Sequence, residues 1–566
     1  MKINLRLAFR RLAIVSGLCL GLVSQAFLYG TWVEPPVTVS DPANNVDPAQ
    51  DAPVMVVNNL GNAISIWNYF TVGSDNELDN VASSFFTQAT GWSPQVTISS
   101  LALAPPLCGG PLYIDQFNPD IAMNDSNYAI AVWEANLIDC NVFPFVMLAA
   151  RSTNGIWNPI ETLALDPSGN LFPKQANVSV NNAGNGLAAW RTLDQIANTY
   201  RTTVVFIPFM QPAGALFSFP LESALGSLSK PFPVINENGN AVVVWEFELP
   251  SFTFGIYAAT FNASTNTWTG PIALDTIAGP FPSQISKNPR CAMDDNGNAV
   301  AIWQINFEVR VAYFNGTNWE TPITLAPAST SDDTVDVVMD PQGNATAVWQ
   351  GDTPDFFVFS SSRLPDGTWT APEIIGQSNY GDGFNVDLSH NPLAVNELGD
   401  VIAGWLLTPD TMQAAIKPFG QAWQPSETVF NGDLQLINQN VGISSCGLAI
   451  AMWGSRLVTP EGQNRVKATI NNTSLIEPPL NPTLKQCCTE FATHTKCFNL
   501  LQWSTNCPVI SFKIFRNGVL IANVPNVPPL AFVDSVCKRG GETYTISAVS
   551  SSGAESIQVP FVVTNF

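Results

Sequence analysis

Short apolar strands separated by glycine turns recur along the chain, and each recurrence ends in a tryptophan. The stretch from Asp294 to Trp303 is one copy, in which two apolar strands flank a tight turn and Gly297 is free to adopt a positive φ. The copies end at Trp67, Trp133, Trp190, Trp245, Trp303, Trp349, Trp405 and Trp453. Six residues earlier stand Gly61, Asn127, Gly184, Gly239, Gly297, Gly343, Gly399 and Gly447. Eight copies in register predict a repeat protein.

Each copy also begins its turn with a short polar residue. Nine residues before the tryptophans stand Asn58, Asn124, Asn181, Asn236, Asp294, Asp340, Asn396 and Ser444. A calcium loop is an alternative for Asp294–Asn298, but the stretch lacks a later bidentate glutamate, and its siblings replace the acids with asparagine. We therefore interpret these residues as caps of their own turns. The tryptophans are interpreted as packing between neighbouring sheets.

A second signal, a tryptophan followed by a proline-containing strand, lies between the copies. It occurs at Trp92, Trp157, Trp268, Trp319, Trp369 and Trp423. Each period therefore holds an inner strand, the strand that ends in the repeat tryptophan, a third strand and this fourth strand. Four strands in a period of 46 to 66 residues predict the blades of a β-propeller.

The two ends of the repeat predict how the ring closes. The eighth copy has no tryptophan–proline strand after it, whereas an orphan copy of that strand stands at residues 30–36. We expect residues 30–39 to complete the last blade, which removes the exposed edges of an open array. The prediction is an all-β fold with an eight-bladed propeller over residues 27–476. Seven blades is the alternative if the irregular last copy is not a full blade.

The pattern changes after Pro479, where residues 499–503, 510–516 and 542–549 alternate as the strands of a small sandwich. Residues 477–566 resemble a fibronectin type III domain. Trp503 matches the core tryptophan of that family, Arg516–Gly518 its hairpin and Tyr544 its tyrosine-corner strand. The segment departs from the family in its five cysteines, and we expect two disulfides within it, with their partners left open.

Residues 1–26 predict a secretory signal peptide, because basic residues precede an apolar run over residues 12–23 and small residues follow it. The run is too short for a typical membrane span, although an uncleaved anchor is an alternative. No other stretch is predicted to be transmembrane. We therefore expect an exported protein that is secreted, periplasmic, or associated with the cell surface or outer membrane.

The cysteines agree with export. Beyond the signal segment there are nine, of which Cys291 and Cys446 lie in the repeats. The disulfide candidates are Cys108, Cys140, Cys487, Cys488, Cys497, Cys507 and Cys537. An odd total leaves one thiol free or joined to another chain. The spacing of Cys487 and Cys488 matches no zinc-ligand pattern, and we predict no metal site and no cofactor.

Composition and charge narrow the partners. The chain is 46% hydrophobic and 12% charged, which indicates a globular protein, and its formal net charge is −22. Such an acidic surface repels phosphate backbones, so we expect no nucleic-acid partner. A protein or a glycan is the expected ligand.

Polar residues at the strand ends opposite the glycine turns form the candidate site. They stand thirteen residues before or one residue after a repeat tryptophan, where the loops of a propeller converge on its channel. The ligand-binding candidates are Asp120, Glu134, Asn177, Arg191, Glu246, Arg290, Gln304, Asp336 and Gln350. A solvated rim is the simplest interpretation of this ring, and a binding surface is the alternative.

No catalytic residue is assigned. The chain has only His390 and His494, which do not support a Ser-His-Asp arrangement. Glu134 and Glu246 would suit glycoside hydrolysis only at the right separation. Asp366–Trp369 resembles a turn of the secreted bacterial propellers grouped with sialidases, but their Ser-x-Asp-x-Gly box is absent. This resemblance implies a fold and not an activity.

The sequence thus favours an exported, non-enzymatic binding or adhesion module of a bacterial envelope or surface. One alternative is a sialidase-like glycan hydrolase or lyase, which a buried carboxylate pair beside an arginine would favour. The other alternative is a structural envelope protein that is crosslinked through a disulfide between chains.

Overall fold

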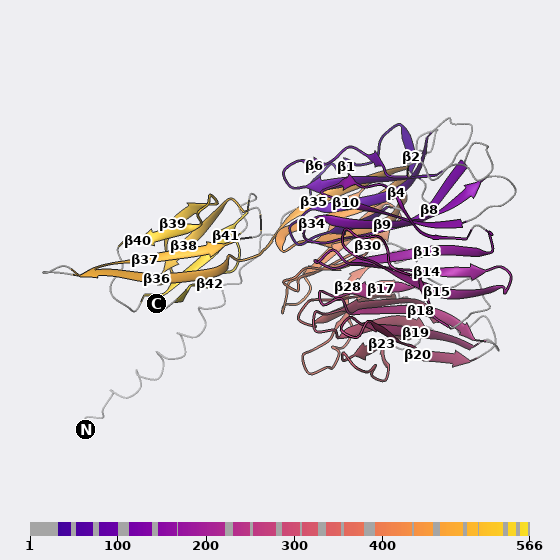
Figure 1. Cartoon of the computed structure of the whole chain (residues 1–566). Coiled ribbons are helices and arrows are strands. Elements are labelled where there is room, and N and C mark those ends of the chain that lie inside the picture. Colours follow the sequence, from indigo (N-terminus) through magenta and orange to yellow (C-terminus); the bar gives the residue numbers. More distant parts are fainter. Residues whose placement is uncertain are drawn as a thin grey trace, which may run out of the picture.

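The computed structural model describes residues 32–46, 53–71, 79–99, 113–138, 145–166, 168–220, 230–249, 253–278, 286–305, 308–326, 335–351, 356–378, 391–432, 435–456, 464–490, 495–505, 507, 509–535, 542–550 and 555–563. All regular structure in these ranges is β-strand, which confirms the all-β prediction. Two bodies are visible, a large one that extends to β35 and a smaller one from β36 onwards (Figure 1). The predicted signal peptide and the side chains of His390, His494, Cys108, Cys140 and Cys537 lie outside these ranges.

The described part of the larger body consists of eight sheets, numbered here in chain order. Sheet 1 holds β2 (Asn44–Val46), β3 (Val54–Val57), β4 (Ala63–Thr71), β5 (Asn80–Thr87), β6 (Gly91–Trp92) and β7 (Val96–Thr97). Sheet 2 holds β8 (Tyr113–Met123), β9 (Tyr128–Ile138), β10 (Phe145–Thr153), β11 (Ile156–Trp157) and β12 (Glu161–Leu165). Sheet 3 holds β13 (Leu171–Val180), β14 (Gly186–Asp194), β15 (Thr199–Ile207) and β16 (Phe217–Ser218). Sheet 4 holds β17 (Phe232–Ile235), β18 (Ala241–Leu249), β19 (Thr253–Asn262) and β20 (Thr267–Ala278).

The second half of the larger body repeats this design. Sheet 5 holds β21 (Ser286–Met293), β22 (Ala299–Ile305), β23 (Glu308–Phe314) and β24 (Ile323–Ala326). Sheet 6 holds β25 (Val335–Met339), β26 (Ala345–Gly351), β27 (Phe357–Ser362) and β28 (Glu373–Gln377). Sheet 7 holds β29 (Leu393–Val395), β30 (Val401–Thr408), β31 (Thr411–Lys417) and β32 (Glu427–Asn431). Sheet 8 holds β33 (Gln435–Ile443), β34 (Cys446–Arg456), β35 (Asn464–Ile476) and β1 (Val37–Thr38).

The repeat tryptophans are packing residues, as predicted. All eight are 0–3% exposed. Hydrophobic clusters lie between consecutive sheets from 1 to 8. One more cluster joins sheet 8 to sheet 1, where Trp67 packs with Leu448 and Val466. The sheets therefore form a propeller-like ring in which each sheet buries its faces against two neighbours.

The polar residues that begin the turns cap them, as predicted, and five of them also connect neighbouring sheets. Each cap accepts a hydrogen bond from the backbone N–H four residues later, as Asn181 Oδ1 does from Asn185 at 2.9 Å. The Asn181 side-chain amide also donates to the carbonyl of Asn236 in the next sheet at 3.0 Å. The same link to the next turn is made by Asn58, Asn124, Asn236 and Asn396.

The N-terminal strand β1 lies in the sheet formed by the last repeat. It is antiparallel to β35, with Val37 opposite Ala468. The backbone N–H of Val39 donates to the carbonyl of Val466 at 2.8 Å. Trp32, which is 7% exposed, belongs to the cluster that holds Trp453. Segments more than 400 residues apart in the sequence thus share one sheet and one core.

The smaller body is a pair of four-stranded sheets. One holds β36 (Leu480–Glu490), β37 (Thr495–Ser504), β40 (Ala531–Asp534) and β43 (Val562–Val563). The other holds β38 (Ser511–Arg516), β39 (Val519–Pro525), β41 (Tyr544–Val549) and β42 (Val559–Pro560). Trp503, Phe512 and Tyr544 lie in the core between them. The Tyr544 hydroxyl donates to Asp534 Oδ2 at 2.8 Å, so this buried phenol is satisfied.

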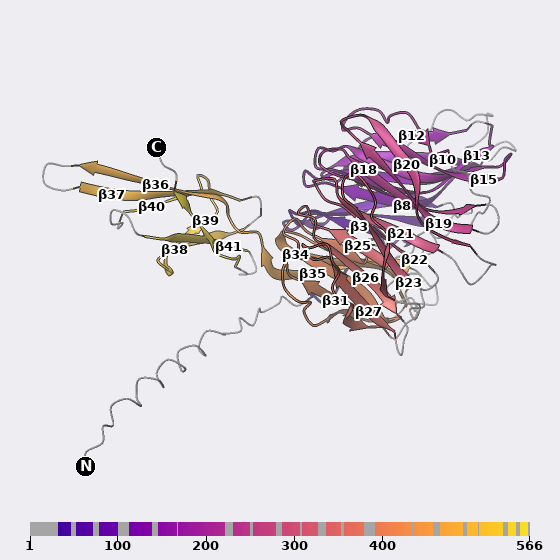
Figure 2. The same ribbon diagram turned by 90° about the horizontal axis from the view of Figure 1, so that it is seen from below.

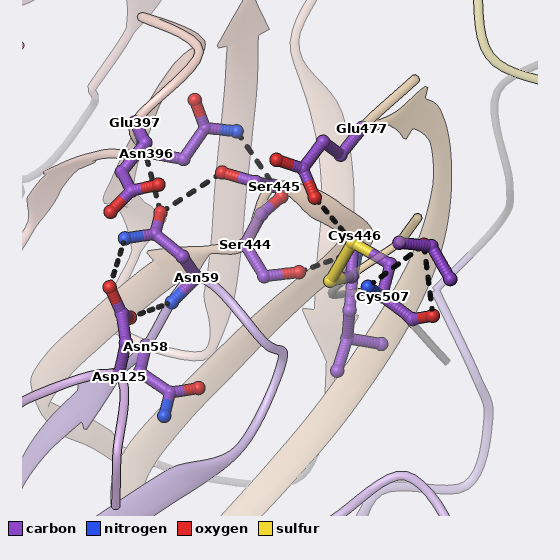
Figure 3. Close-up of a disulfide and its surroundings, with 12 residues drawn as sticks. Asn58, Asn59, Asp125, Asn396, Glu397, Ser444, Ser445, Cys446, Glu477 and Cys507 are labelled. Atoms are coloured by element: carbon purple, nitrogen blue, oxygen red, sulfur yellow. Dashed lines mark hydrogen bonds between the residues drawn. A yellow bond between two sulfur atoms is a disulfide. The ribbon is translucent and has the colours of Figure 1, made fainter. Parts of the chain in front are cut away.

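A disulfide links the two bodies where they meet (Figures 2 and 3). Cys507, which we expected to bond within the C-terminal segment, is instead bonded to Cys446 in β34. Cys446 is missing from the disulfide candidates because a strand cysteine gives no local signal of its partner. Cys497 is also disulfide-bonded, while Cys291 is a buried free thiol. Leu60, from a turn of sheet 1, packs against the same C-terminal core.

Candidate functional site

The nine candidate residues lie at one end of the sheets, and all are buried. Positions thirteen before a tryptophan lie on first strands, and positions one after it lie on tryptophan strands. The C-terminal body contacts the opposite end, through Leu60 and Cys446 beside their turns. Each of the nine side chains is 1–9% exposed, so the interpretation as a solvated rim is wrong. Polar and charged groups at this depth need partners or a ligand.

Two cavities divide the candidates. The first, which we call the channel chamber, has a volume of about 320 Å3 and includes Asp120, Asn177 and Arg290 in its lining. The second, which we call the Arg191 pocket, has a volume of about 310 Å3. Its lining consists of Phe117, Asn118, Glu134, Phe145, Lys174, Gln175, Arg191 and Tyr200. The remaining candidates, Glu246, Gln304, Asp336 and Gln350, are in the lining of neither cavity.

Charges of both signs meet in the channel chamber. Burial raises the pKa of Asp120 to about 6, although Lys230 and Arg290 oppose the shift. Burial likewise raises the pKa of Asp336 to about 6 against the charge of Arg290. The Arg290 guanidinium lies 4.9 Å from the centre of the Phe232 ring. Arg290 thus lies within electrostatic range of two buried carboxyl groups on either side of it in the ring.

Other polar groups of the chamber have structural partners. The Asn177 side-chain amide donates to the carbonyl of Pro231 at 2.9 Å, and Val178 N donates to Asp120 Oδ2 at 2.8 Å. Asn440 donates to the carbonyl of Pro53 at 2.8 Å. These bonds join neighbouring sheets around the axis. We therefore assign Asn177 a role in holding the ring together.

The Arg191 pocket is built at two β-bulges. The pairing register shifts between Phe117 and Asp120 in sheet 2, and between Lys174 and Asn177 in sheet 3. Asn118 and Gln175 have φ angles of 48° and 56°, in the left-handed region. Bulges of this kind redirect a side chain out of the regular alternation and are frequent beside functional sites.

The bulge residues hold the two charged candidates. Asn118 donates a hydrogen bond to Glu134, and Arg191 donates one through Nη2 to the Gln175 side chain. The backbone N–H of Gln175 also lies 3.3 Å from Glu134 Oε1. Burial raises the pKa of Glu134 above its usual value despite these bonds. Sheets 2 and 3 thus contribute matching halves of one pocket.

Arg191 is the least satisfied group in the pocket. It is 6% exposed, and its Nε and Nη1 atoms have no hydrogen-bond partner in the described part of the chain. Burial lowers its pKa, while the charges of Glu246 and Glu134, and Tyr200, oppose that shift. The guanidinium lies 5.4 Å from the Tyr200 ring centre. A buried carboxylate pair therefore flanks this arginine, which is the arrangement that favours an enzyme.

Sequence reasoning missed Asn118 and Gln175, although a signal exists. Both stand fifteen residues before a repeat tryptophan, as do Asn288 and Asn438. Register shifts fall at the same place in sheets 2, 3, 5 and 8. An amide at this position, twice followed by proline, marks the bulged copies.

Two further properties concern the described residues only. They contain no group of three or more His, Cys, Asp and Glu side chains arranged to hold a metal ion. A helix with the length and hydropathy of a membrane span is likewise not found among them.

No family model matches the chain, and no curated protein matches it. A lectin from Burkholderia pseudomallei is similar in structure, with a TM-score of 0.41 and 12% identity over 67% of this chain and 99% of the lectin. A fungal alcohol oxidase in complex with copper has a TM-score of 0.40 and 12% identity over 95% of this chain and all of its own. The polysaccharide lyase Uly1 has a TM-score of 0.38 and 9% identity over 77% of this chain and all of its own. These similarities assign neither a family nor a ligand to this chain.

Proposed function

We propose that this chain is an exported binding protein whose Arg191 pocket takes a carboxylate-bearing sugar unit of an acidic glycan. In this proposal the eight sheets are the blades of a β-propeller that β1 closes. The smaller body is a fibronectin type III-like domain, fastened to the propeller by the Cys446–Cys507 disulfide. The N-terminal segment and the disulfide support export.

The observation that carries this proposal is the buried Arg191 guanidinium with two unpartnered nitrogens in the described structure. Arginine donors suit carboxylate oxygens, and a partly desolvated charge gains most from such a ligand. Lys174 adds a second positive charge, with its Nζ 5.2 Å from the Phe145 ring centre. Phe117, Phe145 and Tyr200 offer apolar surface to the C–H groups of a sugar ring.

Calorimetric titration of the mature protein with oligogalacturonates, beside neutral oligosaccharides of equal length, tests this function. We expect Arg191→Gln to weaken oligogalacturonate binding by roughly 30-fold or more, because losing one partner of a buried charged contact costs about 2 kcal/mol or more. Arg310→Gln is the matched control, since it removes an equal charge from an ion pair with Asp275 in another part of the ring. Equal affinity of wild type and Arg191→Gln would remove the proposal.

A second candidate function is cleavage of the same class of glycan. It is favoured by Glu134 and Glu246, which are 3% and 5% exposed and both influence Arg191. A carboxyl group with a raised pKa suits general acid catalysis. An assay for new reducing or unsaturated ends would show turnover that Glu134→Gln abolishes while binding survives. Binding without turnover by the wild type would leave the binding protein as the function.

A further inference from the structure

A third cavity, of about 120 Å3, lies between sheets 2 and 3. Trp190 and Thr192 contribute to its lining, whereas Arg191 between them contributes to the Arg191 pocket. Successive residues of a strand point to opposite faces, so the two cavities lie on opposite faces of β14. A single water needs about 10–15 Å3, so this cavity has room for several heavy atoms of a ligand. We call it the Trp190 cavity.

The inner wall of the Trp190 cavity is polar. Thr192 Oγ1 and Thr203 Oγ1 lie 2.9 Å apart, and Thr203 Oγ1 lies 2.9 Å from Ser218 Oγ. This row of hydroxyl groups leads from exposed Ser218 to buried Thr192. Trp190 is fully buried, and its indole N–H has no acceptor within the described ranges. A buried N–H without an acceptor is costly, so a ligand oxygen here would gain a strong contact.

Two sibling tryptophans show where this N–H points. The Trp303 indole donates to Asp275 at 3.1 Å, and the Trp405 indole donates to the carbonyl of Gln377 at 3.1 Å. Both acceptors belong to the fourth strand of the preceding sheet, β20 and β28. The Trp190 indole therefore points towards β12, the corresponding strand of sheet 2.

The residue on β12 that matches Asp275 cannot accept a hydrogen bond through its side chain. Asp275 pairs with Ile256, which pairs with Glu246, the residue after Trp245. By the same register Ala164 pairs with Met147, which pairs with Glu134, the residue after Trp133. Ala164 thus replaces the carboxylate with a methyl group and leaves space beside the indole.

The mouth of the cavity is apolar and carries little net charge. Leu165, Leu171 and Leu216 contribute to the lining and are 44%, 38% and 48% exposed. Arg201, which also contributes, lies 3.4 Å from Asp194 in an ion pair. The cavity therefore pairs hydrogen-bonding groups inside with hydrocarbon at its entrance.

We propose that the Trp190 cavity is a second binding site, which takes a neutral hexopyranose unit. A ring or hydroxyl oxygen of the sugar accepts from the Trp190 indole N–H, and further hydroxyl groups meet Thr192 and Thr203. The three leucines contact the C–H face of the sugar. This site does not rest on the proposed function of the Arg191 pocket, because it involves the opposite face of β14 and a neutral ligand.

Fluorine NMR of the full mature chain labelled with 5-fluorotryptophan tests the proposal. The probes are the methyl glycosides of glucose, galactose and mannose, and Trp190→Phe assigns the Trp190 signal among the sixteen tryptophans. We expect one of the glycosides to shift the Trp190 signal saturably, with a dissociation constant in the millimolar range. Thr203→Val should weaken that binding about fivefold, because one hydroxyl contact is lost.

Ala164→Met supplies the decisive comparison, since it fills the space beside the indole without adding an acceptor. It should abolish the hexoside shift, and its perturbed Trp190 signal gives a second assignment if Trp190→Phe does not fold. A Trp190 signal that no hexoside moves would overturn the proposal, as would a shift that persists in Ala164→Met. Loss of oligogalacturonate binding in Arg191→Gln bears only on the Arg191 pocket, so the two proposals fail separately.

Discussion

Cys446 and Cys507 are bonded with their Cα atoms 5.2 Å apart, although 61 residues separate them in the chain. Cys507 Sγ also lies 3.5 Å from Glu477 Oε2, in the segment that joins the two bodies (Figure 3). The bond therefore closes a loop that runs through this connection and half of the C-terminal body. It restricts the C-terminal body to one end of the ring, opposite the candidate site.

The double variant Cys446→Ser, Cys507→Ser should destabilise the C-terminal body while the larger body remains folded. Closing a loop of this length restricts the unfolded chain by about 4 kcal/mol in the chain-entropy model. Calorimetry should show two transitions, of which only the C-terminal one moves to lower temperature. Cys291→Ala, which alters a free thiol in sheet 5, is the control and should leave the C-terminal transition in place. Equal transitions in all three proteins would contradict the prediction.

Trp32→Ala should open the ring at its closure. Trp32 is 7% exposed and packs in the cluster between sheets 7 and 8, and truncating a buried aromatic costs about 3–5 kcal/mol. Urea unfolding followed by circular dichroism should show a lower midpoint. Val37→Ala changes an exposed residue of the neighbouring strand β1 and should stay within about 0.5 kcal/mol of wild type. If Trp32→Ala unfolds with the wild-type midpoint, the N-terminal segment does not close the ring.

Asn181→Ala should weaken the contact between sheets 3 and 4. It removes the acceptor for Asn185 and the donor to the Asn236 carbonyl, both in buried surroundings, at a cost of about 1–3 kcal/mol. The free energy of unfolding in urea measures this loss. Asn182→Ala alters the adjacent residue, whose side chain accepts from Asp125 in an exposed position, and should cost less. Equal losses in the two variants would contradict the assigned role of Asn181.

The sequence predicts the sheets well because one short rule repeats. A cap, a glycine and a tryptophan at fixed spacing determine the hairpin, and burying both faces of each sheet requires a ring. The pairing of β1 with β35 also follows from the sequence pattern, since the orphan tryptophan–proline strand has one unfilled place. Local spacing therefore carries information about contacts over 400 residues apart.

The site was only partly predictable from the sequence. Glu134 and Arg191 are found by their position after a repeat tryptophan, but their burial and shared pocket depend on the bulges at Asn118 and Gln175. A bulge shifts the register without changing the hydrophobic pattern, so alternation alone does not reveal it. The Cys446–Cys507 bond was unpredictable for a related reason, because pairing depends on how the two bodies meet.

The channel chamber should make stability depend on pH through Asp120. Its pKa is about 6 in the folded protein and near 3.8 when unfolded, so the native state binds the proton more tightly. Stability from this group is therefore present below about pH 4 and declines as pH rises to about 6, by up to about 3 kcal/mol. Asp120→Asn does not titrate and should gain on wild type by that amount between about pH 4 and pH 7. Urea unfolding at a series of pH values measures the difference between the two proteins.

Asp366→Asn is the opposite control for that series. Hydrogen bonds from Thr368 lower the pKa of this exposed carboxyl group, so its contribution to stability is lost as pH falls, and the variant should not gain on wild type as pH rises. Asp336, whose pKa is also raised to about 6 beside Arg290, should behave like Asp120 when changed to asparagine. A stability difference between Asp120→Asn and wild type that stays constant across this range would mean that Asp120 is ionised at acidic pH. Lys230 and Arg290 would then outweigh its burial, and the chamber would hold a fully formed charge cluster.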